Sequence, residues 1–224
     1  MGAVKTVCVI PAYNEAEVIA EVVSACRHYV DTVVVVDDCS SDETCAKARE
    51  AGAHVLRHRL QRGAGRATAT GLAAALSMGA DAIVTIDADG QHLPAEIPAV
   101  VAPLTEEQAD LVVGCRHLKR EDMPLIRRLG NRFANLWTWL LIGVSVSDTQ
   151  SGFRAYSRHA AQKLPLTARG YEFCSHTLGE AARLQLKVAE VPITVVYTEY
   201  SQSKGQSFFT SLRTLGRIAR EGIR

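Results

Sequence analysis

Short, continuous apolar runs recur through the first half of the chain, and several stop at a proline or at acidic residues. They are rich in β-branched residues, which is typical of strands covered on both faces of a sheet. Pro11 is expected to end the first run, while Asp37 and Asp87 follow two later ones. The expected strands cover residues 4–10, 32–36, 54–57 and 82–86, followed by 111–115 and 191–197.

The segments between these runs carry apolar residues at the spacing of a helix with one buried face. Ser40 or Ser41 is expected to cap the second of these helices. The alternation of strand and helix predicts an α/β domain with a mostly parallel, Rossmann-like twisted sheet and helices on both of its faces. The expected helices cover residues 15–29, 42–51, an alanine-rich stretch ending near Gly79, and 126–139.

Polar residues follow three of the expected strands, at residues 11–15, 37–38 and 87–89. Ligands of open α/β sheets bind at the carboxyl ends of the strands, and these ends meet at one edge. The pattern therefore predicts a binding site formed by all three clusters.

Composition narrows the class of protein. The chain has 224 residues and a net charge of +1, so overall charge gives no reason to expect nucleic-acid binding. Its six cysteines are dispersed without a C-x-x-C pair, which favours free thiols in a reducing compartment. The N-terminus lacks a signal-peptide pattern, and the most apolar segment, residues 136–146, is too short to span a bilayer. We expect a cytoplasmic protein, peripheral at the cytosolic face if it meets a membrane.

Asp87, Asp89 and Gln91 place oxygen-bearing side chains on a turn directly after a buried strand. Mg²⁺ and Mn²⁺ prefer such ligands and complete their shell with water and substrate phosphates. The alternative is a capped turn in which the aspartates accept hydrogen bonds from the backbone. The position at the end of an apolar strand favours the metal.

Longer motifs surround these residues. The runs DADGQHLP at residues 87–94 and PAYNE at residues 11–15 resemble family 2 glycosyltransferases of the GT-A fold. The likeness is greatest to dolichyl-phosphate mannose synthases and bacterial polyprenyl-phosphate glycosyltransferases, and it extends to about Gln206. Further matches are residues 33–38, Gly63-x-Gly65 with Gly71, residues 113–116, Asn131-Arg132 and residues 148–154.

The resemblance implies roles by position. Asp87, Asp89 and Gln91 match the metal and donor-phosphate site, and Asp89 is implied to be catalytic; His92 beside them is expected to order the metal ligands. For Tyr13 a half-buried packing ring is the alternative to a donor contact. The residues implied to bind the nucleotide-sugar donor are Pro11, Tyr13, Glu15, Asp38, Gly65 and Asp87.

Arg116, Arg132 and Gln150 are implied to bind the acceptor, since guanidinium groups hold phosphate through two parallel hydrogen bonds. A solvated helix charge is the alternative for Arg132. Asp148 matches a catalytic aspartate near the reacting carbon. It would act as base toward a hydroxyl acceptor, or position the substrates if the acceptor is a phosphate that is already ionised. A helix cap is its structural alternative.

One loop departs from the family pattern. The family's Asn-x-Gly-Lys-Gly is here residues 61–65, QRGAG, with Ala64 in place of the lysine. A phosphate or ribose contact is therefore lost, or Arg62 or Arg66 supplies it.

The last residues, 207–224, carry apolar residues on one helical stripe and arginines on another. Such a helix can lie in a membrane interface, or it can pack on the domain with a solvated basic face. The expected organisation is a GT-A catalytic domain over residues 1–206 and this basic amphipathic helix over residues 207–224.

The resemblance implies an inverting transferase that moves a sugar from a GDP- or UDP-sugar to a polyprenyl phosphate, with Mg²⁺ or Mn²⁺ as cofactor. Its expected partners are the nucleotide sugar, the lipid phosphate, and a membrane surface or a membrane-embedded subunit. The alternatives are transfer to a soluble, protein or polysaccharide hydroxyl, and a non-catalytic nucleotide-sugar-binding subunit. The presence of Asp87, Asp89, Gln91 and Asp148 argues against a decayed site.

Overall fold

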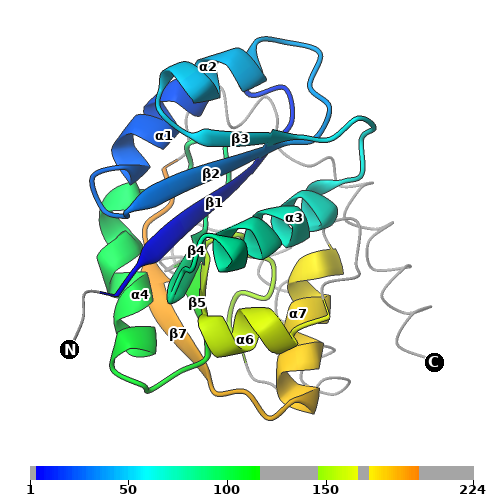
Figure 1. The fold of residues 1–224 in the computed structure, drawn as a ribbon. Coiled ribbons are helices and arrows are strands. Elements are labelled where there is room, and N and C mark those ends of the chain that lie inside the picture. Colours follow the sequence, from blue (N-terminus) through cyan, green and yellow to red (C-terminus); the bar gives the residue numbers. More distant parts are fainter. Residues whose placement is uncertain (1–3, 117–145, 166–171, 197–224) are drawn as a thin grey trace, which may run out of the picture.

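A computed structural model describes residues 4–116, 146–165 and 172–196. They form a seven-stranded sheet between two layers of helices (Figure 1), in the strand order β3-β2-β1-β4-β6-β5-β7. The expected α/β architecture is confirmed. The strands are β1 (Thr6–Ala12), β2 (Thr32–Asp37), β3 (His54–Arg57), β4 (Ala82–Thr85), β5 (Leu111–Arg116), β6 (Arg154–Ser157) and β7 (Val188–Ile193).

The sheet is parallel except for β6, which lies between β4 and β5 and runs antiparallel to both. The register pairs Thr85 of β4 with Arg154 at the start of β6, and Val113 of β5 with the same Arg154. The segment that precedes β6 therefore lies at the carboxyl ends of β4 and β5. This one reversed strand brings residues 148–153 beside Asp87 and Arg116.

Both faces of the sheet are buried, because successive side chains of a strand point to opposite sides. Cys8 and Ile10 of β1 belong to one apolar cluster with α1, α2 and α4, whereas Val7 and Val9 belong to a second with α3, α6 and α7. The helices are α1 (Ile19–Cys26), α2 (Thr44–Glu50), α3 (Ala64–Ser77), α4 (Ile97–Thr105), α6 (Arg158–Lys163) and α7 (Glu172–Arg183), with a 3₁₀ turn, η1 (Pro94–Glu96).

Helix α3 packs closely on the centre of the sheet. A Cβ added at Gly71 would lie 2.2 Å from Cγ1 of Val9, so only glycine permits this approach. Gly71 thus has a packing role on the face of the sheet, away from its edge.

Several expected boundaries were wrong. Pro11 lies inside β1, which continues to Ala12. On one side of β1 the pairing with β4 stops at Val9, so at Pro11 the strand is paired with β2 alone. Helix α1 begins at Ile19 because residues 15–18 form turns. Neither Ser40 nor Ser41 caps α2, whose first amide, that of Thr44, donates to the Asp42 side chain instead.

The late strand is also shifted. It begins at Val188 and ends at Ile193, and Val195 beyond it forms only an isolated bridge with His92. The expected helix at 126–139, the helix at 207–224 and Arg132 lie outside the described residues. The boundary at residue 206 stays a prediction. Among the helices that the structure describes, none is long and apolar enough to cross a membrane.

Candidate active site

The parallel pairing of β1 with β2 and β4 places residues 11–15, 37–38 and 87–89 on the same edge of the sheet. Each strand is buried in the core, and its cluster of polar residues lies at or just beyond its carboxyl end. The edge is completed by Arg116 at the end of β5 and by the segment before β6. The predicted convergence of polar clusters is confirmed.

Hydrogen bonds fasten the loop after β1 to the loop after β2. The amide of Asn14 donates to Oγ of Ser40 at 2.9 Å, and Oδ1 of Asn14 accepts from the amide of Ser41 at 2.9 Å. The amide of Glu15 donates to Oγ1 of Thr44 at 2.8 Å. Asn14 has a φ of 55°, a left-handed conformation that asparagine tolerates better than most residues. The backbone of PAYNE is therefore a fixed frame.

Tyr13 is the exposed member of this frame, with 42% of its surface accessible. The ring lies at the site edge and is not part of either apolar cluster. This favours a ligand contact over the packing role, and the donor contact stays a prediction.

The carboxylate of Asp38 holds the loop that follows β3. Its oxygens accept hydrogen bonds from the amide of Arg62 at 2.9 and 3.1 Å, from the amide of Gly63 at 2.7 Å, and from Nδ1 of His58 at 2.7 Å. Asp38 is 3% exposed. Whatever it contributes to donor binding, this carboxylate already orders the loop that leads into α3 and Gly65.

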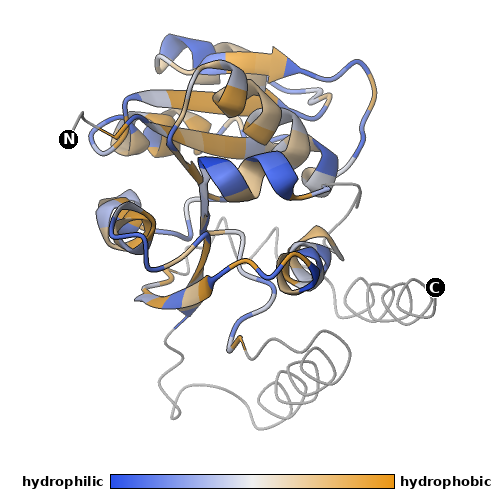
Figure 2. Cartoon of the chain, turned by 60° about the horizontal axis from the view of Figure 1, so that its bottom comes forward, coloured by the Kyte–Doolittle hydropathy of each residue, from blue (hydrophilic) through white to orange (hydrophobic). Residues whose placement is uncertain are grey.

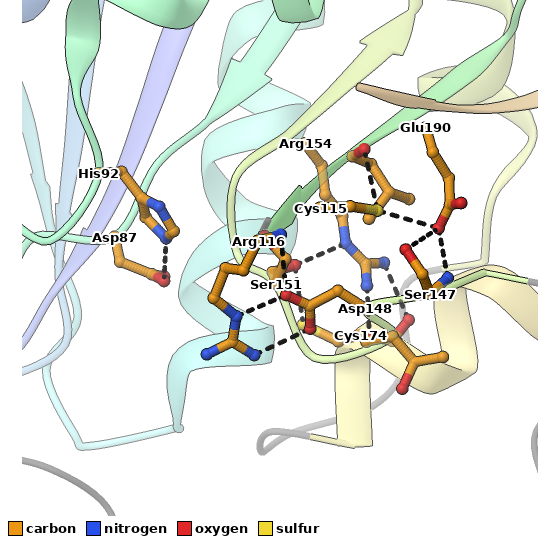
Figure 3. Close-up of polar contacts among 12 residues, drawn as sticks. Asp87, His92, Cys115, Arg116, Ser147, Asp148, Ser151, Arg154, Cys174 and Glu190 are labelled. Carbon is orange, nitrogen blue, oxygen red and sulfur yellow. Dashed lines mark hydrogen bonds and ion pairs between the residues drawn. The ribbon is translucent and has the colours of Figure 1, made fainter. Parts of the chain in front are cut away.

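Asp87 is a half-exposed carboxylate beside the buried ring of His92 (Figure 3). Its Oδ2 is 3.2 Å from Nε2 of His92, whose ring is 7% exposed and packs against Phe153 with centroids 5.4 Å apart. Burial raises the pKa of Asp87, but His92 and the cations of Arg116 and Arg154 hold that pKa below its ordinary value. A Cβ added at Gly152 would lie 2.2 Å from Oδ1 of Asp87, so the carboxylate rests against the backbone of Gly152.

The pKa of Asp89 is shifted in the opposite direction to that of Asp87. Burial and the negative charge of Asp87 raise the pKa of Asp89 above its ordinary value. Its Oδ1 accepts from the amide of Gln91 at 3.0 Å. Two neighbouring carboxylates whose repulsion is only partly compensated are suited to a divalent cation, which removes that repulsion.

Within the described part of the chain, no group of three His, Cys, Asp or Glu residues could hold a metal ion. A Mg²⁺-type site uses one or two carboxylates, and substrate phosphates and waters supply its other ligands. The donor set of Asp87, Asp89 and Gln91 fits such an ion chemically.

Asp148 and Arg116 form a two-point ion pair in this site (Figure 3). Nε of Arg116 is 2.5 Å from Oδ2 of Asp148, and Nη2 is 2.8 Å from Oδ1. The Asp148 side chain is 11% exposed and that of Arg116 is 32% exposed. Burial raises the pKa of Asp148, but its hydrogen bonds and charge interaction with Arg116 outweigh burial and hold the pKa below its ordinary value. Asp148 precedes no helix, so the helix-cap alternative is wrong.

A buried cation organises the segment that carries Asp148. Arg154 is 1% exposed, and its guanidinium donates to the carbonyl oxygens of Ser151, Cys174 and Thr149 at 2.9, 2.8 and 2.8 Å. These bonds tie the loop to the start of β6 and to α7. Arg154 therefore fixes the backbone on both sides of Gln150.

Glu190 of β7 supports the same loop from the other side. Its Oε1 accepts from Oγ of Ser147 at 3.0 Å, from the amide of Ser147, and from Sγ of Cys115 at 2.9 Å. Ser147 precedes Asp148, and Cys115 precedes Arg116. One carboxylate thus links the neighbours of both members of the ion pair. Burial and Glu190 raise the pKa of the Cys115 thiol to about 12, so this thiol stays protonated.

Comparison with known proteins shows the family to which this fold belongs. The family model for glycosyl transferase family 2 matches residues 7–165. The chain belongs to this family. It is a glycosyltransferase, and the resemblance noted in its motifs is confirmed.

Curated relatives of this family 2 glycosyltransferase cover nearly its whole length. It is 36% identical over 233 residues to a UDP-N-acetylglucosamine–dolichyl-phosphate N-acetylglucosaminyltransferase of Methanococcus voltae, covering 94% of this chain and 93% of the relative. It is 32% identical over 213 residues to an undecaprenyl-phosphate mannosyltransferase of Micrococcus luteus, covering 89% and 87%.

A solved structure matches the whole fold. Glucosyl-3-phosphoglycerate synthase from Mycobacterium tuberculosis, in complex with Mn²⁺, UDP and phosphoglyceric acid, superposes with a TM-score of 0.74 at 27% identity. The match covers 99% of this chain and 76% of the synthase. The GT-A fold is confirmed, and this structural neighbour is a divalent-metal complex.

The remaining implied residues of the glycosyltransferase are placed as follows. The Gln150 amide donates to Oγ of Ser175 on α7 at 2.9 Å, and Gly65 is buried in the first turn of α3. Ala64, in the family's lysine position, is the first residue of α3 and is exposed. The specific roles of these residues stay predictions.

Three supporting residues had no role in the sequence interpretation: Glu190, Arg154 and His58. Arg154 stands within a recognised motif, so its place in the family pattern was the available signal. Glu190 lies in the edge strand β7, and His58 directly follows the other edge strand, β3. A charged or polar residue at such a position is common and gives no signal in the sequence. Their partners come from other elements, so only the fold reveals them.

Proposed function

We propose that this chain transfers a sugar from a nucleoside diphosphate sugar to the phosphate of a polyprenyl or dolichyl phosphate, with Mg²⁺ or Mn²⁺ as cofactor and with inversion at the sugar carbon. Two curated relatives are named for transfer to dolichyl phosphate and undecaprenyl phosphate. Their names give different sugars, so the donor is proposed only as a class, a GDP- or UDP-sugar. The acceptor places the enzyme at a membrane surface, on the cytosolic face.

The observation that carries the acceptor class is the ion pair of Asp148 with Arg116. A hydroxyl acceptor must lose its proton to a base, and an efficient base has a pKa near the working pH. The Arg116 guanidinium holds the pKa of Asp148 below the ordinary carboxylate value, which makes this carboxylate a weak base. A phosphate monoester, with a second pKa of about 6, is already ionised at neutral pH and needs none.

The residues then divide by charge. Asp87, Asp89 and Gln91 hold the cation, which when bound would balance the negative charge that grows on the leaving diphosphate. Arg116 attracts the acceptor phosphate, and Asp148 fixes the direction of its guanidinium through two hydrogen bonds. PAYNE and Asp38 frame the nucleoside. The donor diphosphate is then neutralised by the cation and the acceptor phosphate by the arginine, so these two anions can approach each other.

Arg116 provides the test. Arg116→Ala should raise the half-saturating concentration of polyprenyl phosphate about ten- to hundredfold, since hydrogen bonds to charged groups contribute about 1.5–3 kcal/mol. Donor affinity, measured by calorimetry with the nucleoside diphosphate and Mg²⁺, should change much less. Arg116→Lys keeps the charge but loses the two-point geometry, and should fall between.

Arg183→Ala is the matched control, because Arg183 pairs with Glu180 on the surface of α7. It should leave both substrates unaffected. If Arg116→Ala instead weakens donor binding and keeps the dependence on acceptor, Arg116 binds the donor diphosphate, and the phosphate acceptor loses its structural support.

A further inference from the structure

Glu190 is a charged residue inside a strand of a sheet whose strands are mainly hydrophobic (Figure 2). On an edge strand such a side chain can simply face solvent, but Glu190 accepts hydrogen bonds from other elements instead. In the strands that the structure describes, every other Asp, Glu, Lys or Arg residue is the first or last residue of its strand. These residues are Asp37, Arg57, Arg116 and Arg154.

The strand register places Glu190 in one row with Arg154. Glu190 pairs with Val113 of β5, and Val113 pairs in turn with Arg154 of β6. Paired residues of neighbouring strands direct their side chains to the same face of a sheet. Val113 belongs to the apolar cluster formed with α3, α6 and α7. The two charged side chains therefore leave the sheet on this face, on either side of Val113.

These two side chains hold different parts of the segment that carries Asp148 (Figure 3). Arg154 donates to carbonyl oxygens after Asp148. Glu190 holds the part before it, because Oε1 accepts from Oγ of Ser147 at 3.0 Å and from the amide of Ser147. The cation binds carbonyl oxygens and the carboxylate binds N–H and O–H groups. Asp148 is thus anchored on both of its sides.

Glu190 also contacts the other half of the ion pair. Sγ of Cys115 lies 2.9 Å from the same Oε1 atom, and Cys115 directly precedes Arg116. Because the pKa of this thiol is raised to about 12, the thiol stays protonated and can donate. One carboxylate oxygen is therefore bonded to the residue before Asp148 and to the residue before Arg116.

The backbone gives less support at this point. Among the described residues, a main-chain hydrogen bond joins β5 to the segment before β6 at Gly114 and Phe153, with a length of 2.8 Å. Asp148 and Arg116 lie beyond this bond, where side chains must hold β5 and the segment together. Glu190 is placed to do so.

The geometry of the ion pair depends on this support. A guanidinium and a carboxylate make two parallel hydrogen bonds only while their planes are aligned. Without Glu190, Ser147 loses an acceptor for both its amide and its hydroxyl, and Asp148 can move with it. Arg116 would then lose the partner that directs its guanidinium. The residues that frame the donor, PAYNE and Asp38, are held by other contacts.

We propose that Glu190 is a positioning residue for the acceptor phosphate. It holds Ser147 and Cys115, and through them it keeps the ion pair in the geometry in which Arg116 binds the phosphate. The proposal rests on the proposed function, since that function assigns the acceptor phosphate to Arg116.

The first test is Glu190→Ala in the full chain. This substitution should raise the half-saturating concentration of polyprenyl phosphate about tenfold, a coupling that is typical of residues in one hydrogen-bond network. Nucleoside diphosphate affinity, measured by calorimetry with Mg²⁺, should not change. The melting temperature should change little, because Glu190 is exposed.

Glu190→Gln is the conservative variant, since it keeps an oxygen acceptor at the same place. Hydrogen bonds to a charged group are roughly twice as strong as neutral ones, so about half of the effect should remain, an increase of about threefold. A residue that served only the stability of the fold would leave the half-saturating concentration unchanged in both variants.

Asp110→Ala is the matched control, because Asp110 joins the same strands at their opposite ends. Its Oδ2 accepts from the amide of Lys187 at 3.0 Å, and its Oδ1 is 3.5 Å from Oγ of Ser157. Asp110→Ala should lower the melting temperature and leave the dependence on acceptor as in wild type.

A double variant tests whether Glu190 acts through the arginine. In an Arg116→Ala background, Glu190→Ala should raise the half-saturating acceptor concentration no further. Three results would overturn the proposal: an unchanged acceptor dependence in Glu190→Ala, an equal effect of Asp110→Ala, or effects that multiply in the double variant.

The failure of the proposed function would look different. It would appear in the wild-type enzyme, as an absence of transfer to polyprenyl phosphate, and it would refute the role of Glu190 as well. A failure of the Glu190 proposal alone would appear only in the variants, while the wild-type enzyme transfers sugar to the lipid phosphate.

Discussion

Gly152→Ala tests how closely the site is built around Asp87. The backbone of Gly152 is not in the left-handed region, so alanine is allowed there on conformational grounds. The new Cβ, however, would lie 2.2 Å from Oδ1 and 2.5 Å from Oδ2 of Asp87. Carbon and oxygen do not approach this closely, so the carboxylate must move by about 1 Å or turn to another rotamer.

The two consequences differ in size. The clash involves the end of a side chain that is 46% exposed, so Asp87 can swing aside with little loss of folding stability. Activity depends on the carboxylate itself, and a displacement of about 1 Å in a catalytic site can cost about a hundredfold in rate. We therefore expect kcat to fall about a hundredfold, the Mg²⁺ concentration at half-maximal rate to rise, and the melting temperature to change little.

The assay is the initial rate against Mg²⁺ concentration at saturating substrates, with thermal unfolding measured in parallel. Gly79→Ala is the control, because Gly79 has a φ of 81° and no atom within 4 Å of an added Cβ. That substitution strains the backbone without touching the site, so it should lower the melting temperature and spare the metal dependence. A Gly152→Ala enzyme with near-wild-type rate and metal dependence would refute the packing of Asp87 on Gly152 as a functional contact.

Three further predictions follow from the same site. Asp89→Ala should lose activity by orders of magnitude and keep its circular dichroism spectrum, and wild-type turnover of this variant in metal-depleted buffer would show the metal assignment to be wrong. Asp38→Ala should weaken nucleoside diphosphate binding in calorimetry without abolishing metal dependence. It should also speed proteolysis of the loop at Arg62, because the amides of Arg62 and Gly63 lose their hydrogen-bond acceptor. Unchanged affinity would place the nucleoside elsewhere. The pH profile should have an acid limb near pH 6, set by the acceptor phosphate. Because the pKa of Asp148 is lowered, this carboxylate stays ionised below the ordinary carboxylate range and does not set the limb. The limb should therefore move when a phosphonate acceptor of different pKa is used. A limb that stays at the same pH would belong to a group of the enzyme.

The first half of the fold could be predicted because β1, β2 and β4 are mostly apolar and polar residues follow at their carboxyl ends. β6 escaped this rule, since it begins with Arg154, a charged residue that is buried by donating to three carbonyl oxygens. A hydropathy pattern cannot predict that these hydrogen bonds allow a charged residue to be buried. The reversed direction of β6 was also hidden, and with it the contact of Gly152 with Asp87.

The candidate site divides in the same way. Asp87 and Asp89 could be placed from local sequence, because each follows a strand whose end must lie at the ligand-binding edge. The pairing of Asp148 with Arg116 joins residues 32 positions apart and depends on the order β4-β6-β5. Of the two roles expected for Asp148, this pairing favours the positioning role over the role of a base.

The central claim is that the acceptor is a lipid phosphate. Its most direct measurement compares transfer of labelled sugar, with Mg²⁺ and a panel of GDP- and UDP-sugars, to a polyprenyl phosphate and to the matching polyprenol. These acceptors share the hydrocarbon chain and differ only in the nucleophile. We expect metal-dependent transfer to the phosphate and none to the alcohol. Equal transfer to both, or transfer to the alcohol alone, would contradict it.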